Sequence, residues 1–154
     1  MNEVVLVTGS ESLTGRKLIE KLLAADCRVV APVEGKHSEA PETGTGNLTV
    51  MPWNRGSWFS TKTVIRETLR VFGGINAAWV LHQPVRSDAP FSDAQSGDVE
   101  EVLEKNIKGY IALTRDLIGP LVSSEGFLGL VVPHEIGGPA GPIGTMVHGA
   151  FSGF

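Results

Sequence analysis

The sequence predicts an α/β protein built on a parallel sheet of about five strands, with helices on both faces. Continuous apolar runs such as Val4–Val7 are typical of strands that are covered on both sides. These runs alternate along the chain with segments whose apolar residues recur at helical spacing. Because parallel strands are joined by right-handed crossovers, the alternation favours a doubly wound sheet with the strand order 3-2-1-4-5.

The first half of the chain predicts three strands and two helices. After the strand at 4–7, helical spacing begins at Gly15 and carries Leu18, Ile19, Leu22 and Leu23 on one face. "CRVVAPV" at 27–33 predicts a second strand closed by a turn at Gly35, and "LTVMPW" at 48–53 predicts a third. The polar segment between them predicts a loop, and residues 61–72 predict a helix stopped by two glycines.

The second half predicts a fourth strand at 75–81, a long loop, a helix at 99–122 and a fifth strand at 126–132. The helix carries one apolar stripe that is interrupted by the polar Asn106. We therefore expect one Rossmann-like domain over residues 1–132. Residues 133–154 hold six glycines and three prolines among 22 residues and predict a Gly/Pro-rich tail.

Composition excludes several classes of protein. The net charge of -4 argues against nucleic acid or an anionic membrane surface as the main partner. No apolar stretch approaches the ~18 residues of a membrane span, and no basic leader precedes the first strand, so we expect a cytoplasmic protein. The single cysteine, Cys27, rules out an internal disulfide and suits a reducing compartment.

The stretch "TGSESLTGRK" at 8–17 has the layout of a phosphate-binding turn, in which a strand leads through glycines into a helix. Such a turn directs backbone N–H groups and the positive end of the helix at one place, which suits a pyrophosphate. Gly9 would allow the tight turn and Gly15 the close packing of helix on strand. Ser12 and Leu13 stand where a middle glycine would let the backbone approach the phosphates, so a tight turn without ligand remains the alternative.

These motifs resemble the N-terminal part of the short-chain dehydrogenase/reductase family. The turn is similar to the family's TGxxxGxG pattern or its TGxxGxxG variant, and "EVLEKNIKGYIALTRDLIGPLV" is similar to its long helix, including Asn106 and Gly109. The resemblance implies NAD or NADP as cofactor and no metal. It implies a place in the proton relay for Asn106. The cofactor-binding residues that we expect are Thr8, Gly9, Ser12, Leu13, Gly15, Arg16, Glu34 and Asn54.

Several positions depart from the family pattern. The acidic residue that holds the ribose hydroxyls should fall at Val33, and Glu34 lies one place later, on the other face if the strand continues. Asn54 replaces the aspartate near the adenine ring. His82 and Gln83 are far bulkier than the small residues that follow the family's fourth strand.

The catalytic residues that the resemblance implies are missing. Hydride transfer in the family needs a tyrosine with a lysine four residues on, because the nearby ammonium lowers the tyrosine pKa. The only tyrosine is Tyr110 and the last lysine is Lys108, so no such pair exists. An ungapped register places His148 at the tyrosine position, where a histidine is either a substitute acid or a solvated loop residue. His82, His134, His148 and Glu135 have no recognised metal-ligand spacing.

Three functions remain open from the sequence. The first is a non-catalytic cofactor-binding or regulatory domain, the second an oxidoreductase that acts with His148 or with a second chain, and the third a structural module without nucleotide. We also expect a homo-oligomer formed through the 99–122 helix or through the edge of strand five, because unpaired strand edges are usually covered. The alternative is that the Gly/Pro-rich tail folds back over this edge.

Overall fold

The computed structural model describes residues 2–35, 46–84, 92–93, 95–132 and 149–150. It confirms a five-stranded, wholly parallel sheet in the predicted order β3-β2-β1-β4-β5. The elements along the chain are β1 (Val4–Val7), α1 (Leu13–Ala24), β2 (Arg28–Glu34), β3 (Leu48–Trp53), α2 (Trp58–Phe72), β4 (Ala77–Leu81), α3 (Ser96–Leu103), the π-helical η1 (Glu104–Lys108), α4 (Gly109–Ser123) and β5 (Phe127–Val131).

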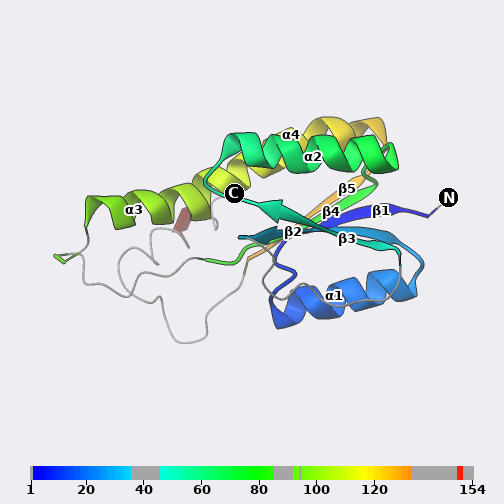
Figure 1. Cartoon of the computed structure of the whole chain (residues 1–154), viewed down its shortest axis with the longest axis horizontal. Helices are drawn as coiled ribbons and strands as arrows, with labels where there is room; N and C mark the ends of the chain where they lie inside the picture. The colour runs from blue at the N-terminus through cyan, green and yellow to red at the C-terminus, as the bar shows by residue number, and fades with distance from the viewer. Residues whose placement is uncertain (1, 36–45, 85–91, 94, 133–148, 151–154) are drawn as a thin grey trace.

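The sheet is covered on both faces, as Figure 1 shows: α1 lies on one side, and α2 and α4 lie on the other. The α1 side packs Ile19 against Val5, Val7 and Val29. The α2 and α4 side packs Leu113 and Leu117 against Leu6 and Val80. Alternate residues of each strand therefore enter two separate apolar layers, which explains why the central strands are continuous apolar runs.

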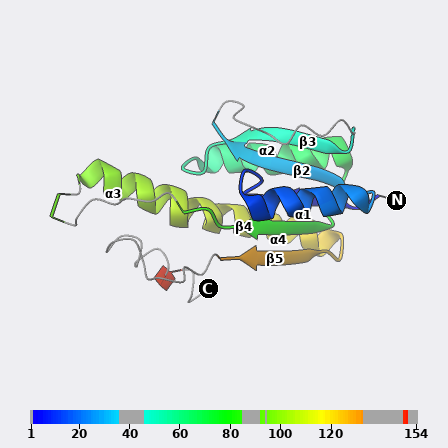
Figure 2. The same cartoon turned by 90° about the horizontal axis from the view of Figure 1, so that it is seen from below.

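Three predicted helices differ from the structure at their ends, the first because α1 begins at Leu13 and not at Gly15. Residues 61–72 were expected to form a helix, but α2 begins at Trp58, because the side chain of Ser57 accepts a hydrogen bond from the Ser60 N–H and caps it. The helix predicted at 99–122 begins at Ser96 and ends at Ser123. It is one helical rod of α3, η1 and α4, whose first part projects beyond the sheet in both views (Figures 1 and 2).

The outer edge of β5 meets no other strand in the described part of the chain, since its only partner there is β4. Residues 133–148 and 151–154 of the predicted tail lie outside the described residues. The predicted division at residue 132 stays a prediction. Among the described residues, no helix combines the length and the apolar character that crossing a membrane requires.

Candidate functional site

The predicted phosphate turn joins the end of β1 to the start of α1, at the carboxyl edge of the sheet. Thr8 is buried, and its hydroxyl donates to the backbone carbonyl of Leu81 at 3.2 Å. Gly9 has a φ of 68°, which favours glycine. A Cβ at Gly9 would also lie only 2.9 Å from the Leu81 Cβ and 3.3 Å from the Gln83 Cγ. The turn is thus fixed against the end of β4 by two constraints that only glycine meets.

Ser12 and Gly15 close the turn onto the helix. The Ser12 hydroxyl donates to the Gly9 carbonyl at 2.7 Å and accepts from the Gly15 N–H at 3.0 Å, so it caps α1. A Cβ at Gly15 would lie 2.1 Å from the Gly9 oxygen, so this position admits no side chain. Leu13, which sequence reasoning placed among the phosphates, is 71% exposed, so its side chain is not packed into the turn.

The environment of the turn favours an anion. The first turn of α1 contains no acidic residue, which leaves the positive end of the helix uncompensated there. Ser10 is fully buried within the turn, and its hydroxyl has no hydrogen-bond partner among the residues that the structure describes. Buried polar groups are normally paired, and an unpaired one suggests an absent partner. Arg16 is half-buried and Lys17 is exposed on the same helix.

Glu34 lies at the end of β2 and is held by two cations. β2 continues through Glu34, so its side chain points to the face opposite that of Val33, as predicted. One carboxylate oxygen accepts from the Arg55 Nε, and the other lies 3.4 Å from the Lys105 Nζ. Lys105 also pairs with Glu101 at 2.7 Å. The expected ribose-binding carboxylate is therefore part of an ion network on the η1 side of the sheet.

Arg55 extends this network to the end of β4. One of its Nη atoms donates to the Gln83 carbonyl and lies 3.3 Å from the Tyr110 hydroxyl. The Gln83 N–H donates to the same hydroxyl at 3.0 Å. Tyr110 and the Glu34 carboxylate raise the Arg55 pKa against the effect of its burial. Gly109 allows the loop that carries Arg55 to pack against the helix, because a Cβ at this position would lie 2.3 Å from the Arg55 backbone oxygen.

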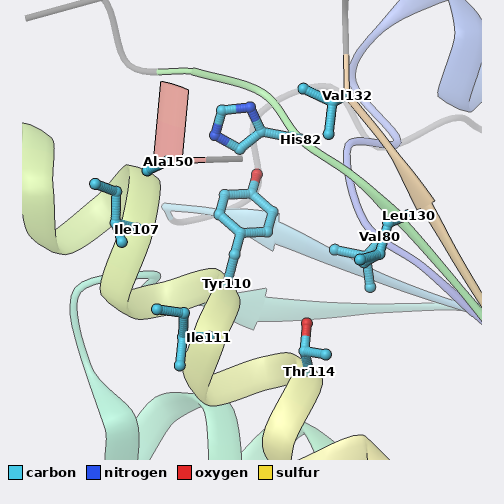
Figure 3. Close-up of a pocket in the computed structure, with 9 residues that line it drawn as sticks. All are labelled: Val80, His82, Ile107, Tyr110, Ile111, Thr114, Leu130, Val132 and Ala150. Carbon is cyan, nitrogen blue, oxygen red and sulfur yellow. The ribbon is translucent and has the colours of Figure 1, made fainter. Parts of the chain in front are cut away.

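Asn106 lies in the π-helical segment η1, is fully buried and is followed by the tightly packed Gly109. His82, which follows β4, hydrogen-bonds to the backbone of Asn106, and its ring lies 4.8 Å from that of Tyr110 in an edge arrangement. Figure 3 shows the Tyr110 hydroxyl directed towards the His82 ring. Burial, and to a smaller degree the Arg55 cation, lower the His82 pKa from 6.5 to about 4. His82 is therefore uncharged at neutral pH.

The structure brings most of the predicted residues to the carboxyl edge of the sheet but in separate groups. Thr8, Gly9, Ser12 and Gly15 form the turn, whereas Glu34 faces Arg55 and Lys105. Asn54 is exposed, and its side chain accepts from the Gly56 N–H at 3.0 Å within the loop before α2. The predicted His148, and with it His134 and Glu135, lie outside the described residues.

Sequence reasoning missed Arg55 and Lys105. A sequence signal for Arg55 is weak, since it is a single basic residue in a loop. Gly109 is a stronger signal, because a glycine inside a long helix usually marks a close approach by other backbone. No group of three histidine, cysteine or acidic side chains in the described part of the chain is arranged to hold a metal ion.

No protein-family model matches the sequence, and no curated protein matches it. Solved structures do match. A short-chain dehydrogenase from Leptospira borgpetersenii with bound NAD+ matches with a TM-score of 0.77 and 14% identity, over 97% of this chain and 61% of that one. The NADH-dependent reductase A1-R′, complexed with NAD, matches with a TM-score of 0.81 and 13% identity, over 97% of this chain and 68% of that one.

A short-chain dehydrogenase/reductase of the glucose/ribitol dehydrogenase type from Brucella melitensis matches with a TM-score of 0.75 and 15% identity, over 99% of this chain and 66% of that one. This chain thus spans about two thirds of the length of these enzymes. At such low identity the likeness establishes the architecture. The protein has the Rossmann-like fold of the short-chain dehydrogenases/reductases.

Proposed function

We propose that this chain binds NAD or NADP at the Gly9–Gly15 turn as a domain of the short-chain dehydrogenase/reductase type, and that it does not transfer hydride alone. The observation that carries the proposal is the turn itself. Gly9 and Gly15 each admit no side chain, so the turn brings its backbone close to the N-terminal end of α1, the end of a helix that favours a pyrophosphate. The two NAD-bound neighbours have the same fold, which supports this placement.

The buried Ser10 hydroxyl gives the proposal a second support. A fully buried hydroxyl with no partner among the described residues costs the folded protein free energy, unless a ligand supplies the missing hydrogen bond. A pyrophosphate oxygen at the turn is an acceptor of the right kind. The residues that would hold the cofactor are therefore Gly9, Ser10 and the backbone at the start of α1, with the half-buried Arg16 on the first turn of the same helix.

The ribose part of the cofactor meets an altered site. The Glu34 carboxylate, which would accept hydrogen bonds from ribose hydroxyls, already interacts with Arg55 and Lys105. Ribose hydroxyls must compete for these oxygens with two cations, whose interactions with the carboxylate join opposite full charges. We therefore expect weaker binding of a dinucleotide than a free carboxylate at this position would give.

The lack of hydride transfer is inferred from the only tyrosine. Tyr110 is 3% exposed, and its hydroxyl oxygen accepts from the Gln83 N–H and lies beside the Arg55 cation. The residue four places on is Thr114, not a lysine. A general acid must pass a proton to its substrate, and this hydroxyl is already engaged by the Gln83 N–H and by Arg55. We therefore propose the regulatory or cofactor-sensing role, and the oxidoreductase that acts with His148 or with a second chain stays the alternative.

We also propose that the chain self-associates through α4. Ile111, Ile118 and Val122 recur at helical spacing on α4 and are 42%, 53% and 72% exposed. Contiguous exposed apolar residues mark interaction surfaces. Ile118→Glu should reduce the association measured by analytical ultracentrifugation, whereas Val71→Glu, the same kind of change on exposed α2 surface, should not. A wild-type monomer at tens of micromolar would contradict this part of the proposal.

Titration of the protein with NADH and with NADPH, followed by fluorescence and calorimetry, tests dinucleotide binding. Ser10→Ala should weaken binding roughly 10- to 100-fold, since a hydrogen bond to a charged group contributes about 1.5–3 kcal/mol. The same change should leave thermal stability equal or higher, because it removes a buried unpaired hydroxyl. Gly15→Ala should abolish binding, and Gly119→Ala, where a Cβ meets nothing within 4 Å, is its matched control. Failure of the wild type to bind either cofactor would overturn the proposal.

A further inference from the structure

An apolar cavity of about 110 Å³ lies between the helical rod and the carboxyl ends of β4 and β5, and it is partly open to solvent. Figure 3 shows it enclosed by Ile107 and Ile111 from the rod, by Val80 and Leu130 from the strands, and by the rings of His82 and Tyr110. It lies on the α4 side of the sheet, whereas the Gly9–Gly15 turn leads into α1 on the opposite side (Figure 1). The cavity is therefore a site separate from the phosphate turn.

The walls of the cavity are almost entirely apolar. The Tyr110 hydroxyl oxygen is occupied by the Gln83 N–H, and the Arg55 cation beside it is paired with Glu34. His82, the one titratable lining group besides Tyr110, is 6% exposed. An ion entering the cavity would leave water and meet no opposite charge among these lining residues. Burying an unpaired charge is strongly unfavourable, so the cavity selects against ions.

The size of the cavity sets the size of what fills it. A buried apolar cavity of roughly 150 Å³ stays dry and binds benzene. The present cavity is somewhat smaller but has an opening, so that a small ring or a branched aliphatic group fits while a substituent extends outwards. Such a group displaces only poorly held water, so its binding free energy comes from the burial of apolar surface alone.

We propose that this cavity binds an uncharged small molecule through an apolar end of about the size of a six-membered ring, with any polar substituent directed to the opening. The cavity accepts benzyl alcohol and excludes the benzylammonium ion, which has the same shape and one positive charge. Binding here does not depend on the proposed dinucleotide site, since the two sites share no residue. A test made without dinucleotide therefore separates the two proposals.

The test is a titration of methyl-labelled protein with benzyl alcohol and, separately, with benzylammonium, followed by NMR. Benzyl alcohol should shift the methyl signals of Val80, Ile107 and Leu130 in a saturable manner, and benzylammonium should not. Ile111→Trp places a large side chain in the cavity and should abolish the shifts. Ile118→Trp is the matched control, because it makes the same change on the same exposed stripe of α4 but outside the cavity lining.

Both tryptophan variants replace half-exposed residues, so their folding is checked by circular dichroism and their self-association by analytical ultracentrifugation. Absence of saturable shifts in the wild type would overturn the proposal, and this includes the case in which another part of the chain fills the cavity. Equal binding by the two variants, or equal binding of the alcohol and the ammonium ion, would overturn it as well.

Discussion

Burial of an uncharged histidine makes the stability of this fold depend on pH. His82 is 6% exposed, and its pKa falls from 6.5 to about 4, chiefly because burial disfavours the imidazolium form and also because Arg55 is nearby. A hydrogen bond to the Asn106 backbone opposes this shift but is the smaller effect. The unfolded chain takes up a proton as the pH falls through 6.5, whereas the folded chain does so only near 4. The contribution of the neutral His82 to the free energy of unfolding is therefore fully present above pH 6.5, and it is lost as the pH falls towards 4.

The size of the effect follows from the shift. A difference of about 2.5 pKa units between the two states corresponds to about 3 kcal/mol at full development. Between pH 8 and pH 5 the same two pKa values give a loss of about 2 kcal/mol. Since a domain is typically stable by about 5–15 kcal/mol, such a loss is readily measured.

The assay is urea unfolding at several pH values from 8 to 5, for the wild type and for His82→Asn. The asparagine amide retains a hydrogen-bond donor for the Asn106 backbone but does not titrate. The absolute stability of His82→Asn differs from that of the wild type because the packing changes. The quantity compared is therefore the change in unfolding free energy with pH. The wild type should lose about 2 kcal/mol more than the variant over this range. Identical pH dependence of the two proteins would refute the assignment of a neutral, buried His82.

Three further outcomes follow from close packing and from the ion network. Gly109→Ala should lower the free energy of unfolding by about 1–3 kcal/mol, because the new Cβ would lie 2.3 Å from the Arg55 backbone oxygen. Gly119→Ala, an open position in the same helix, should raise it by up to about 1 kcal/mol, and thermal melting of both variants checks the contrast. Arg55→Leu should destabilise by about 2–3 kcal/mol, since Arg55 is 11% exposed and leaves Glu34 with one cation fewer. Urea unfolding of a double-mutant cycle with Glu34→Gln should then give less than additive losses, and full additivity would contradict the pairing.

Most of the fold could be predicted from the sequence because the apolar pattern of the strand segments agrees with the burial of these strands in the sheet. The third strand, 48–53, is confirmed to the residue, and the strand order follows from the crossover rule. The predicted start of α2 is three residues late, because the prediction follows apolar spacing and leaves out the capping role of Ser57. The π-helical segment has no signal in apolar spacing, since Asn106 continues the stripe at a buried position.

The candidate site was predictable only where it is local. The Gly9–Gly15 turn spans seven residues, and each constraint on it arises within the turn or from β4 and the residues directly after it. Arg55, by contrast, joins Glu34, 21 residues away, to Gln83 and Tyr110, 28 and 55 residues away. Such contacts exist only once the sheet and α4 are assembled. Residue type at a single loop position therefore gave no indication of them.

The position of Tyr110 clarifies what the absence of a tyrosine–lysine pair means. The chain does place a phenol beside a permanent cation, as that chemistry requires, with the Tyr110 oxygen 3.3 Å from Arg55. This pair, however, lies between β4 and the helices, and the cation is engaged by the Glu34 carboxylate and the Gln83 carbonyl. The arrangement thus ties the loop before α2 to the end of β4 and to α4, and it orders the carboxyl edge of the sheet on which the phosphate turn also depends.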